Sequence, residues 1–150
     1  MRSYGMYDAS RGLTLALAAA LAGLALWGAS QVGTQTTGRF WLGAAVAVEA
    51  GCGFVAARRP GKLPPDTVSA TYALEYGKNT LEVAADAIAG GARVVIHDDV
   101  LATGGTVEAI AGLVEGLGGS VVGVNFVIEL SFLGGRERLA KYDLFSLITY

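Results

Sequence analysis

Residues 94–106 read VVIHDDVLATGGT, and this stretch decides the fold of the chain. An apolar, β-branched run ends in two adjacent carboxylates, Asp98 and Asp99, and a turn rich in Gly and Thr follows them. A helical pattern begins directly after that turn. The order of strand, acidic pair, loop and helix is typical of α/β proteins, which bind ligands at the carboxyl ends of their strands.

The loop at residues 102–106 predicts a phosphate site, because backbone N–H groups and the positive end of a helix dipole suit an anion. The two carboxylates would repel that anion. They suit a neutral, hydroxylic part of the ligand or a metal ion that the ligand holds. An alternative role for the pair is to cap the helix, but carboxylates at a buried strand end need partners, which favours function. A sugar phosphate satisfies both halves of the stretch.

Segments on both sides of this stretch alternate between helix and strand. Apolar residues at helical spacing predict helices over residues 40–49 and 107–117, and glycines follow each of them. Nearly continuous apolar runs predict buried strands, at residues 54–57, 121–128 and 144–150. The alternation predicts an α/β fold with a mostly parallel sheet flanked by helices.

Two segments between residues 58 and 84 hold further candidate site residues. Arg58 and Lys62 lie beside a Pro-Gly turn directly after a predicted strand, where a loop is suited to grip an anion. The alternative interpretation is an ordinary solvated surface loop, in which Arg58 and Lys62 have no ligand. Residues 67–83 predict a β-hairpin, and Glu75 lies near its tip. An isolated Glu is more often an ordinary solvated side chain than a functional one.

Composition indicates one domain with a substantial core. The chain has 150 residues, of which 53% are hydrophobic and 16% are charged. A net charge of −2 without a basic block argues against nucleic acid as a partner. The single Cys52 cannot form an internal disulfide, which favours a reducing, cytoplasmic setting. No cluster of His, Cys and carboxylates has zinc spacing, so the sequence predicts no metal ligand set.

Three motifs, in this order, resemble those of the type I phosphoribosyltransferases, and of their adenine phosphoribosyltransferase branch in particular. They are RRPGKLP at residues 58–64, ALEYG at residues 73–77 and DDVLATGGT at residues 98–106. The resemblance runs from about residue 40 to residue 150. It implies the type I fold with a hairpin lid. The implied reaction is purine salvage, in which adenine and phosphoribosyl pyrophosphate give AMP and pyrophosphate.

The same resemblance implies a role for each candidate residue. Asp98 and Asp99 would hold the ribose hydroxyls next to the cationic sugar, and Glu75 would exchange a proton with the purine. The 5′-phosphate would be bound by the loop residues Ala102, Thr103, Gly104, Gly105 and Thr106. Pyrophosphate, with Mg²⁺ bound mainly by the substrate, would be attracted by Arg58 and Lys62. The base would be flanked by Val100 and Leu130. His97 stands where the family usually has an aliphatic residue, and we interpret it as a packing residue.

The N-terminal part of the chain leaves several interpretations open. Residues 13–29 are an uncharged apolar run at the short end of what spans a membrane, and they also resemble the centre of a signal peptide. We favour an Ala- and Leu-rich buried helix over a membrane span. We therefore divide the chain into an atypical segment, residues 1–39, and a core domain, residues 40–150.

An alternative function follows from that segment. The family normally has an N-terminal hood over the purine, and here residues 1–39 stand in its place. A chain altered in this way, by truncation or a frameshift, would bind nucleotide with impaired catalysis, or would be tethered to a membrane through residues 13–29. The resemblance also implies a homodimer.

Overall fold

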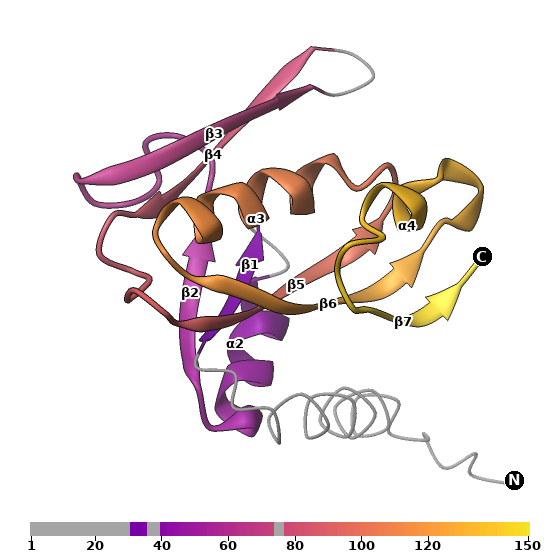
Figure 1. The fold of residues 1–150 in the computed structure, drawn as a ribbon, viewed down its shortest axis with the longest axis horizontal. Coiled ribbons are helices and arrows are strands. Elements are labelled where there is room, and N and C mark those ends of the chain that lie inside the picture. The colour runs from indigo at the N-terminus through magenta and orange to yellow at the C-terminus, as the bar shows by residue number, and fades with distance from the viewer. Residues whose placement is uncertain (1–30, 36–39, 74–76) are drawn as a thin grey trace, which may run out of the picture.

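The computed structural model describes residues 31–35, 40–73 and 77–150 (Figure 1). Five strands form one sheet, which consists of β1 (Gln31–Gln35), β2 (Gly53–Ala57), β5 (Arg93–Leu101), β6 (Ser120–Glu129) and β7 (Leu144–Thr149). Their order is β2-β1-β5-β6-β7, and every neighbouring pair is parallel. The predicted α/β class with a mostly parallel sheet is therefore confirmed.

A separate antiparallel hairpin and short helices complete the described fold. The hairpin consists of β3 (Thr67–Ala73) and β4 (Lys78–Ala84). The helical elements are α2 (Phe40–Ala50), α3 (Gly105–Gly116), α4 (Gly135–Arg138) and the 3-10 turn η1 (Ser131–Leu133). The predicted helix that follows the Gly- and Thr-rich loop is α3. Between β4 and β5, residues 85–86 form a turn and residues 87–88 a bend.

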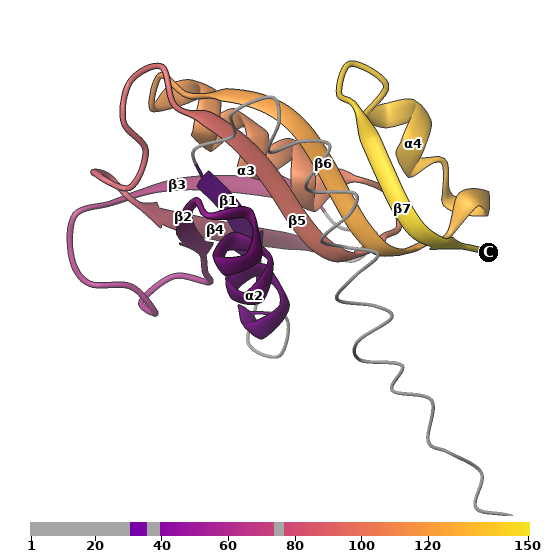
Figure 2. The same cartoon turned by 90° about the horizontal axis from the view of Figure 1, so that it is seen from below.

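The elements stack in layers (Figure 1). Helix α3 covers one face of the sheet, and the hairpin lies over α3 on the side away from the sheet. Helix α2 lies against the opposite face, which is the face nearer the viewer in Figure 2. The carboxyl end of β5 and the start of α3 therefore lie beneath the hairpin.

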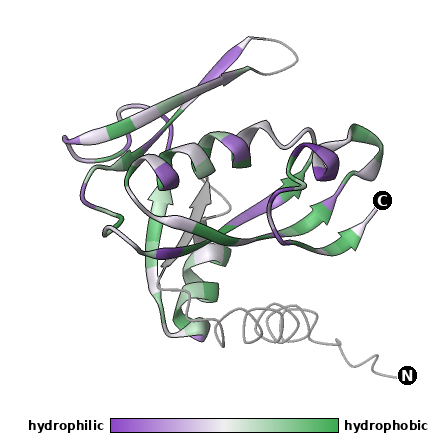
Figure 3. Cartoon of the chain, in the orientation of Figure 1, coloured by the Kyte–Doolittle hydropathy of each residue, from purple (hydrophilic) through white to green (hydrophobic). Residues whose placement is uncertain are grey.

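Alternation along β5 divides the core between the two faces of the sheet. Val94 and Ile96 pack with Ile110 of α3 in the larger cluster of buried residues. Val95 packs with Val46 and Ala47 of α2 in the smaller one. Figure 3 shows hydrophobic colour on much of α2 and β2, and hydrophilic colour on turns of α3, on part of the hairpin and near the carboxyl end of β5. The β5 strand is covered on both faces, as its continuous apolar run predicts.

Strand β1 bears on the predicted domain boundary. It lies between β2 and β5 and pairs with both. On the β5 side the register runs from Gln31 beside Val94 to Thr34 beside His97. The predicted core of residues 40–150 leaves this interior strand out, so we propose that the core domain includes β1. The apolar run at residues 13–29 lies outside the described residues. Among the helices that the structure describes, none has the length and apolar character needed to cross a membrane.

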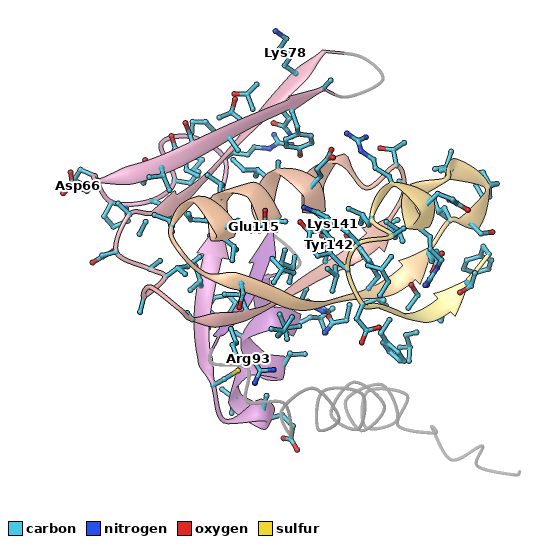
Figure 4. The ribbon with its side chains drawn as sticks, in the orientation of Figure 1. Asp66, Lys78, Arg93, Glu115, Lys141 and Tyr142 are labelled. Atoms are coloured by element: carbon cyan, nitrogen blue, oxygen red, sulfur yellow. The ribbon has the colours of Figure 1, made fainter. Side chains whose placement is uncertain are left out.

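Exposed polar contacts join the end of α3 to the segment before β7 (Figure 4). The hydroxyl of Tyr142 donates to Glu115 Oε1 at 3.0 Å, and Lys141 Nζ lies 3.5 Å from the same oxygen. Lys141 Nζ also lies 4.6 Å from the centre of the Tyr142 ring. Because these groups are in contact with water, we expect each to add little stability. Lys78, at the other end of the described structure, extends outward from the hairpin.

A buried carboxylate fastens the end of β6 to α4 and β7. Glu129 is 3% exposed and receives two hydrogen bonds from Arg136, from Nε to Oε1 at 2.7 Å and from Nη2 to Oε2 at 2.5 Å. The Ser146 hydroxyl donates to Glu129 Oε2 at 2.6 Å. The Arg136 hydrogen bonds are the main cause that lowers the pKa of Glu129 from its ordinary value of 4.5. This arrangement connects three elements around one charge.

We expect Arg136→Met to lower the free energy of unfolding by about 2–3 kcal/mol, because it leaves a buried carboxylate without its ion-pair partner. The cost stays below that of a deeply buried pair, since the Arg136 side chain is 47% exposed. Chemical denaturation at pH 7 measures this change. The matched variant Arg138→Met breaks a pair that is exposed on both sides, Arg138 with Glu108, and should cost less than about 1 kcal/mol. Equal costs for the two variants would contradict the assignment of Glu129 and Arg136 as a buried ion pair.

Because the Glu129 pKa is lowered in the fold, the contribution of Glu129 to the free energy of unfolding is present above pH 4.5 and is lost as the pH falls further.

Candidate functional site

A cavity of about 130 Å³ lies at the carboxyl end of β5, between the hairpin and the start of α3. Many of the predicted site residues line it, namely Asp98, Val100, Ala102, Thr103, Gly104, Gly105 and Thr106. The remaining lining residues are Tyr72 and Ala73 of the hairpin and Val107 of α3. The structure thus brings one of the two acids and the whole predicted phosphate loop into a single cavity.

Gly104 shapes the loop at the start of α3. Its φ of 79° lies in the left-handed region, which glycine adopts without strain. A Cβ at this position would lie 3.1 Å from Leu139 Cγ and 3.2 Å from the Gly135 carbonyl oxygen, so there is also little room for a side chain. Gly104 is the N-cap of α3 and has no side-chain oxygen to cap it. The first N–H groups of α3 are therefore left for an anionic ligand.

Helix α4 supports this loop from behind. The Arg138 guanidinium donates from Nη1 to the Thr103 carbonyl oxygen at 3.4 Å and pairs with Glu108, at 2.6 Å from Nη2 to Oε2. Gly135 lies against Ala102 so closely that a Cβ built on Gly135 would be 2.2 Å from the Ala102 carbonyl oxygen. The sequence does not predict this approach, because nothing in the local pattern of residues 134–139 connects them with the loop.

The two acids differ in position. Asp98 is 3% exposed and lines the cavity, and its Oδ1 accepts a hydrogen bond from the Asp99 backbone N–H at 3.0 Å. Asp99 is half-buried and is not part of the cavity lining. Successive side chains of a strand point to opposite faces, so Asp99 shares a face with His97.

His97 forms a buried pair with Asn125 of β6, directly beside it in the sheet. The ring nitrogen Nδ1 donates to Asn125 Oδ1, and both side chains are 1% exposed. Burial lowers the pKa of His97 from its ordinary value of 6.5, although Asn125 and the charge of Asp99 oppose the shift. His97 is therefore neutral at pH 7, and it packs inside the sheet as the sequence predicts.

Stability should fall as the pH drops below 6.5, because the unfolded chain binds a proton at His97 more readily than the folded chain does. The variant His97→Gln should lack this fall, since an amide can still donate to Asn125 but does not titrate. Denaturation curves at pH 7.5, 6.5 and 5.5, compared between the two proteins, measure the difference in slope. Parallel slopes would show that His97 does not determine this part of the pH dependence.

Three further predicted site residues that the structure describes, Arg58, Lys62 and Leu130, are not among the residues that line the cavity. Arg58 follows β2 and forms two backbone hydrogen bonds with Glu82 of β4, at 2.8 and 2.7 Å. Lys62 is exposed on the loop that follows, where the Gly61 N–H donates to Glu82 Oε2 at 3.2 Å. This loop begins at the same edge of the parallel sheet as the acids, two strands away from β5. Leu130 is half-buried after β6, and its N–H donates to the Leu101 carbonyl at 2.9 Å. Glu75 lies outside the described residues.

Tyr72 is a cavity residue that sequence reasoning missed. It lies on β3, and its hydroxyl oxygen accepts hydrogen bonds from Thr106 Oγ1 and from Asn79 Nδ2, each at 3.2 Å. The only signal in the sequence is its place within the predicted hairpin, and that does not reveal contact with a loop more than thirty positions away.

Comparison with known proteins identifies a family. No protein-family model matches the sequence. The adenine phosphoribosyltransferase of Desulfitobacterium hafniense is 59% identical over 119 residues, which are 79% of this chain and 68% of the relative. That of Flavobacterium johnsoniae is 51% identical over 119 residues, 79% of this chain and 69% of the relative.

Solved structures give the same result. The crystal structure of adenine phosphoribosyltransferase from Thermoanaerobacter pseudethanolicus matches with a TM-score of 0.84 and 46% identity, over 95% of this chain and 83% of that one. The Rhodothermus marinus enzyme matches with a TM-score of 0.85 and 45% identity, over 92% of this chain and 79% of that one. These matches confirm the resemblance that rests on the three motifs, and the chain belongs to the adenine phosphoribosyltransferase family.

Proposed function

We infer that the chain is a purine salvage enzyme, a phosphoribosyltransferase that converts adenine and phosphoribosyl pyrophosphate to AMP and pyrophosphate. The observation that carries this function is the cavity of this family member, where Asp98 lies beside a complete Gly- and Thr-rich loop at the start of α3. The loop suits a 5′-phosphate and the carboxylate suits ribose hydroxyls. The cavity therefore offers one group for each part of a phosphoribosyl unit, the loop for the 5′-phosphate and Asp98 for the ribose hydroxyls.

In the reaction, the bond between ribose C1 and the pyrophosphate oxygen breaks, and a bond from C1 to a purine nitrogen forms. Positive charge develops on the ribose ring as pyrophosphate leaves. A carboxylate held beside that ring stabilises the charge. We assign this role to Asp98, which lines the cavity, with Asp99 as its neighbour at the strand end. Glu75 receives the proton that the purine loses, a role that rests on the ALEYG motif.

The loop residues 102–106 fix the 5′-phosphate, so that the ribose is held in one position over Asp98. Arg58 and Lys62, on the loop after β2, attract the leaving pyrophosphate at the same edge of the sheet. Val100, which lines the cavity, and Leu130 flank the base.

We propose that Mg²⁺ enters as part of the substrate. Among the described residues no group of three or more His, Cys, Asp or Glu side chains could hold a metal ion. Mg²⁺ commonly binds through one or two carboxylates together with phosphate oxygens of a substrate. The diphosphate of phosphoribosyl pyrophosphate offers such oxygens.

We also propose a homodimer in the cytoplasm. The dimer rests on the family resemblance, and α2, with the sequence FWLGAAVAVEA and Val48 81% exposed, is an apolar helix that suits contact with a second copy of the chain. Cys52 is a free thiol, which suits a reducing compartment.

The direct test uses the purified full-length chain with adenine, phosphoribosyl pyrophosphate and Mg²⁺. We expect AMP and pyrophosphate in equal amounts, and much slower reaction when hypoxanthine replaces adenine. Absence of AMP beside an active control enzyme would refute the transferase. Binding of AMP without turnover would support the nucleotide-binding alternative.

A further inference from the structure

Tyr72 connects the hairpin with the phosphate loop. It comes from β3, and among the described residues that line the cavity it is the one aromatic side chain. Its register partner on β4 is Asn79, and its hydroxyl meets Thr106, the last residue of the loop. The hydroxyl therefore lies where two elements distant in sequence come together.

The hydrogen bonds around this hydroxyl leave its own hydrogen free. A phenol oxygen carries one hydrogen and accepts hydrogen bonds through its lone pairs. The Tyr72 oxygen accepts from Asn79 Nδ2 and from Thr106 Oγ1, each at 3.2 Å. Among the described residues, the hydrogen of this hydroxyl has no acceptor. Because Tyr72 lines the cavity, a ligand is the natural acceptor for that hydrogen.

We propose that Tyr72 is a phosphate-contact residue, supplied by the hairpin, that donates to the 5′-phosphate beside Thr106. This inference rests on the proposed function, because it takes the loop at residues 102–106 to be the phosphate site. The phosphate accepts from the Tyr72 hydroxyl, while the Thr106 hydroxyl donates to the Tyr72 oxygen 3.2 Å away. The contact adds a donor from outside the loop.

The contact also couples the hairpin to the ligand. Asn79 holds the Tyr72 hydroxyl from β4, so phosphate, Tyr72 and Asn79 form one chain of hydrogen bonds across the hairpin. Binding of phosphate therefore fixes the hairpin over the cavity through both of its strands.

The test compares two variants of the full-length chain. Tyr72→Phe removes the hydroxyl and keeps the ring. Thr71→Val is the matched control, because the Thr71 hydroxyl bonds to that of Thr80 at 2.9 Å on the exposed side of the same hairpin. Calorimetry measures the Kd of AMP and the Kd of adenosine, which lacks the phosphate. Thermal unfolding shows that each variant is folded.

We expect Tyr72→Phe to weaken AMP binding by roughly tenfold or more, the loss expected for a hydrogen bond to a charged group. Adenosine binding should stay unchanged, so the Kd of AMP divided by the Kd of adenosine rises by the same factor. Thr71→Val should leave that ratio as in the wild type. If Tyr72 had only a structural role, Tyr72→Phe would weaken the binding of AMP and of adenosine by the same factor. An unchanged ratio in Tyr72→Phe would therefore overturn the proposal.

The outcomes separate this proposal from the proposed function. A wild type that binds AMP but forms none from its substrates would refute the transferase, while the Kd ratio would still decide the role of Tyr72. A wild type that binds adenosine as tightly as AMP would overturn the phosphate contact directly. Active wild type with an unchanged Tyr72→Phe ratio would overturn the contact alone.

Discussion

Asp98→Asn is expected to lower kcat/KM for phosphoribosyl pyrophosphate by about a hundredfold to a thousandfold, the range seen when one group that stabilises transition-state charge is lost. The change removes the negative charge beside the ribose and keeps the size of the side chain. The amide oxygen can still accept the hydrogen bond from the Asp99 N–H, so the end of β5 should stay in place. Initial rates of AMP formation at saturating adenine measure the effect.

The matched control is Asp99→Asn, which removes the same charge one residue further along the strand. Because Asp99 is not part of the cavity lining, its effect should be smaller than that of Asp98→Asn. Wild-type rates in Asp99→Asn would remove Asp99 from the proposed catalytic pair. Wild-type rates in Asp98→Asn would refute the role of the cavity carboxylate.

Gly135→Ala is the second substitution with a large expected effect, although Gly135 touches no substrate in our proposal. Its new Cβ would lie 2.2 Å from the Ala102 carbonyl oxygen and 2.7 Å from Leu101 Cδ1, so the backbone of the phosphate loop must move. Displacement by about 1 Å can cost a hundredfold in rate. We expect a loss of about that size in kcat/KM, with a raised KM for phosphoribosyl pyrophosphate.

Gly112→Ala makes the same chemical change on α3, where no atom beyond the backbone of the helix itself and the neighbouring residues lies within 4 Å of the new Cβ. It should keep full activity and raise the free energy of unfolding by up to about 1 kcal/mol, since Ala favours a helix interior. Full activity in Gly135→Ala would show that the loop tolerates the displacement. Loss of activity in both variants would point to a cause other than the contact with Ala102.

The fold was predictable wherever the pattern was continuous. The apolar runs of β5 and β6 and the helical spacing of α3 are signals that a single sequence carries, because each depends on neighbours within one element. The cavity was predictable at residues 98–106 for the same reason, since acids, loop and helix follow one another in the chain. Strand β1 was less visible, because its sequence QVGTQ is short and has a single large apolar residue.

The rest of the site depends on contacts between distant segments. Tyr72, Gly135 and Arg138 reach the loop only after the hairpin and α4 have packed around it. No spacing rule predicts such contacts, because their partners are set by the tertiary fold. The separation of Asp98 from Asp99 also needs the structure, since adjacent acids look equivalent in the sequence.

The position of β1 has a consequence for the order of folding. Strands β5 and β6 are joined by one helix, whereas β1 must find β5 across the whole of α2, β2 and the hairpin, to pair Gln31 with Val94. Closing a long loop costs chain entropy before any contact forms, and pairings between distant segments are slow. We therefore expect β5, α3 and β6 to assemble early and β1 to join them late. Until it does, the unpaired edge of β5 is exposed to other chains, which makes that interval the one in which aggregation competes with folding.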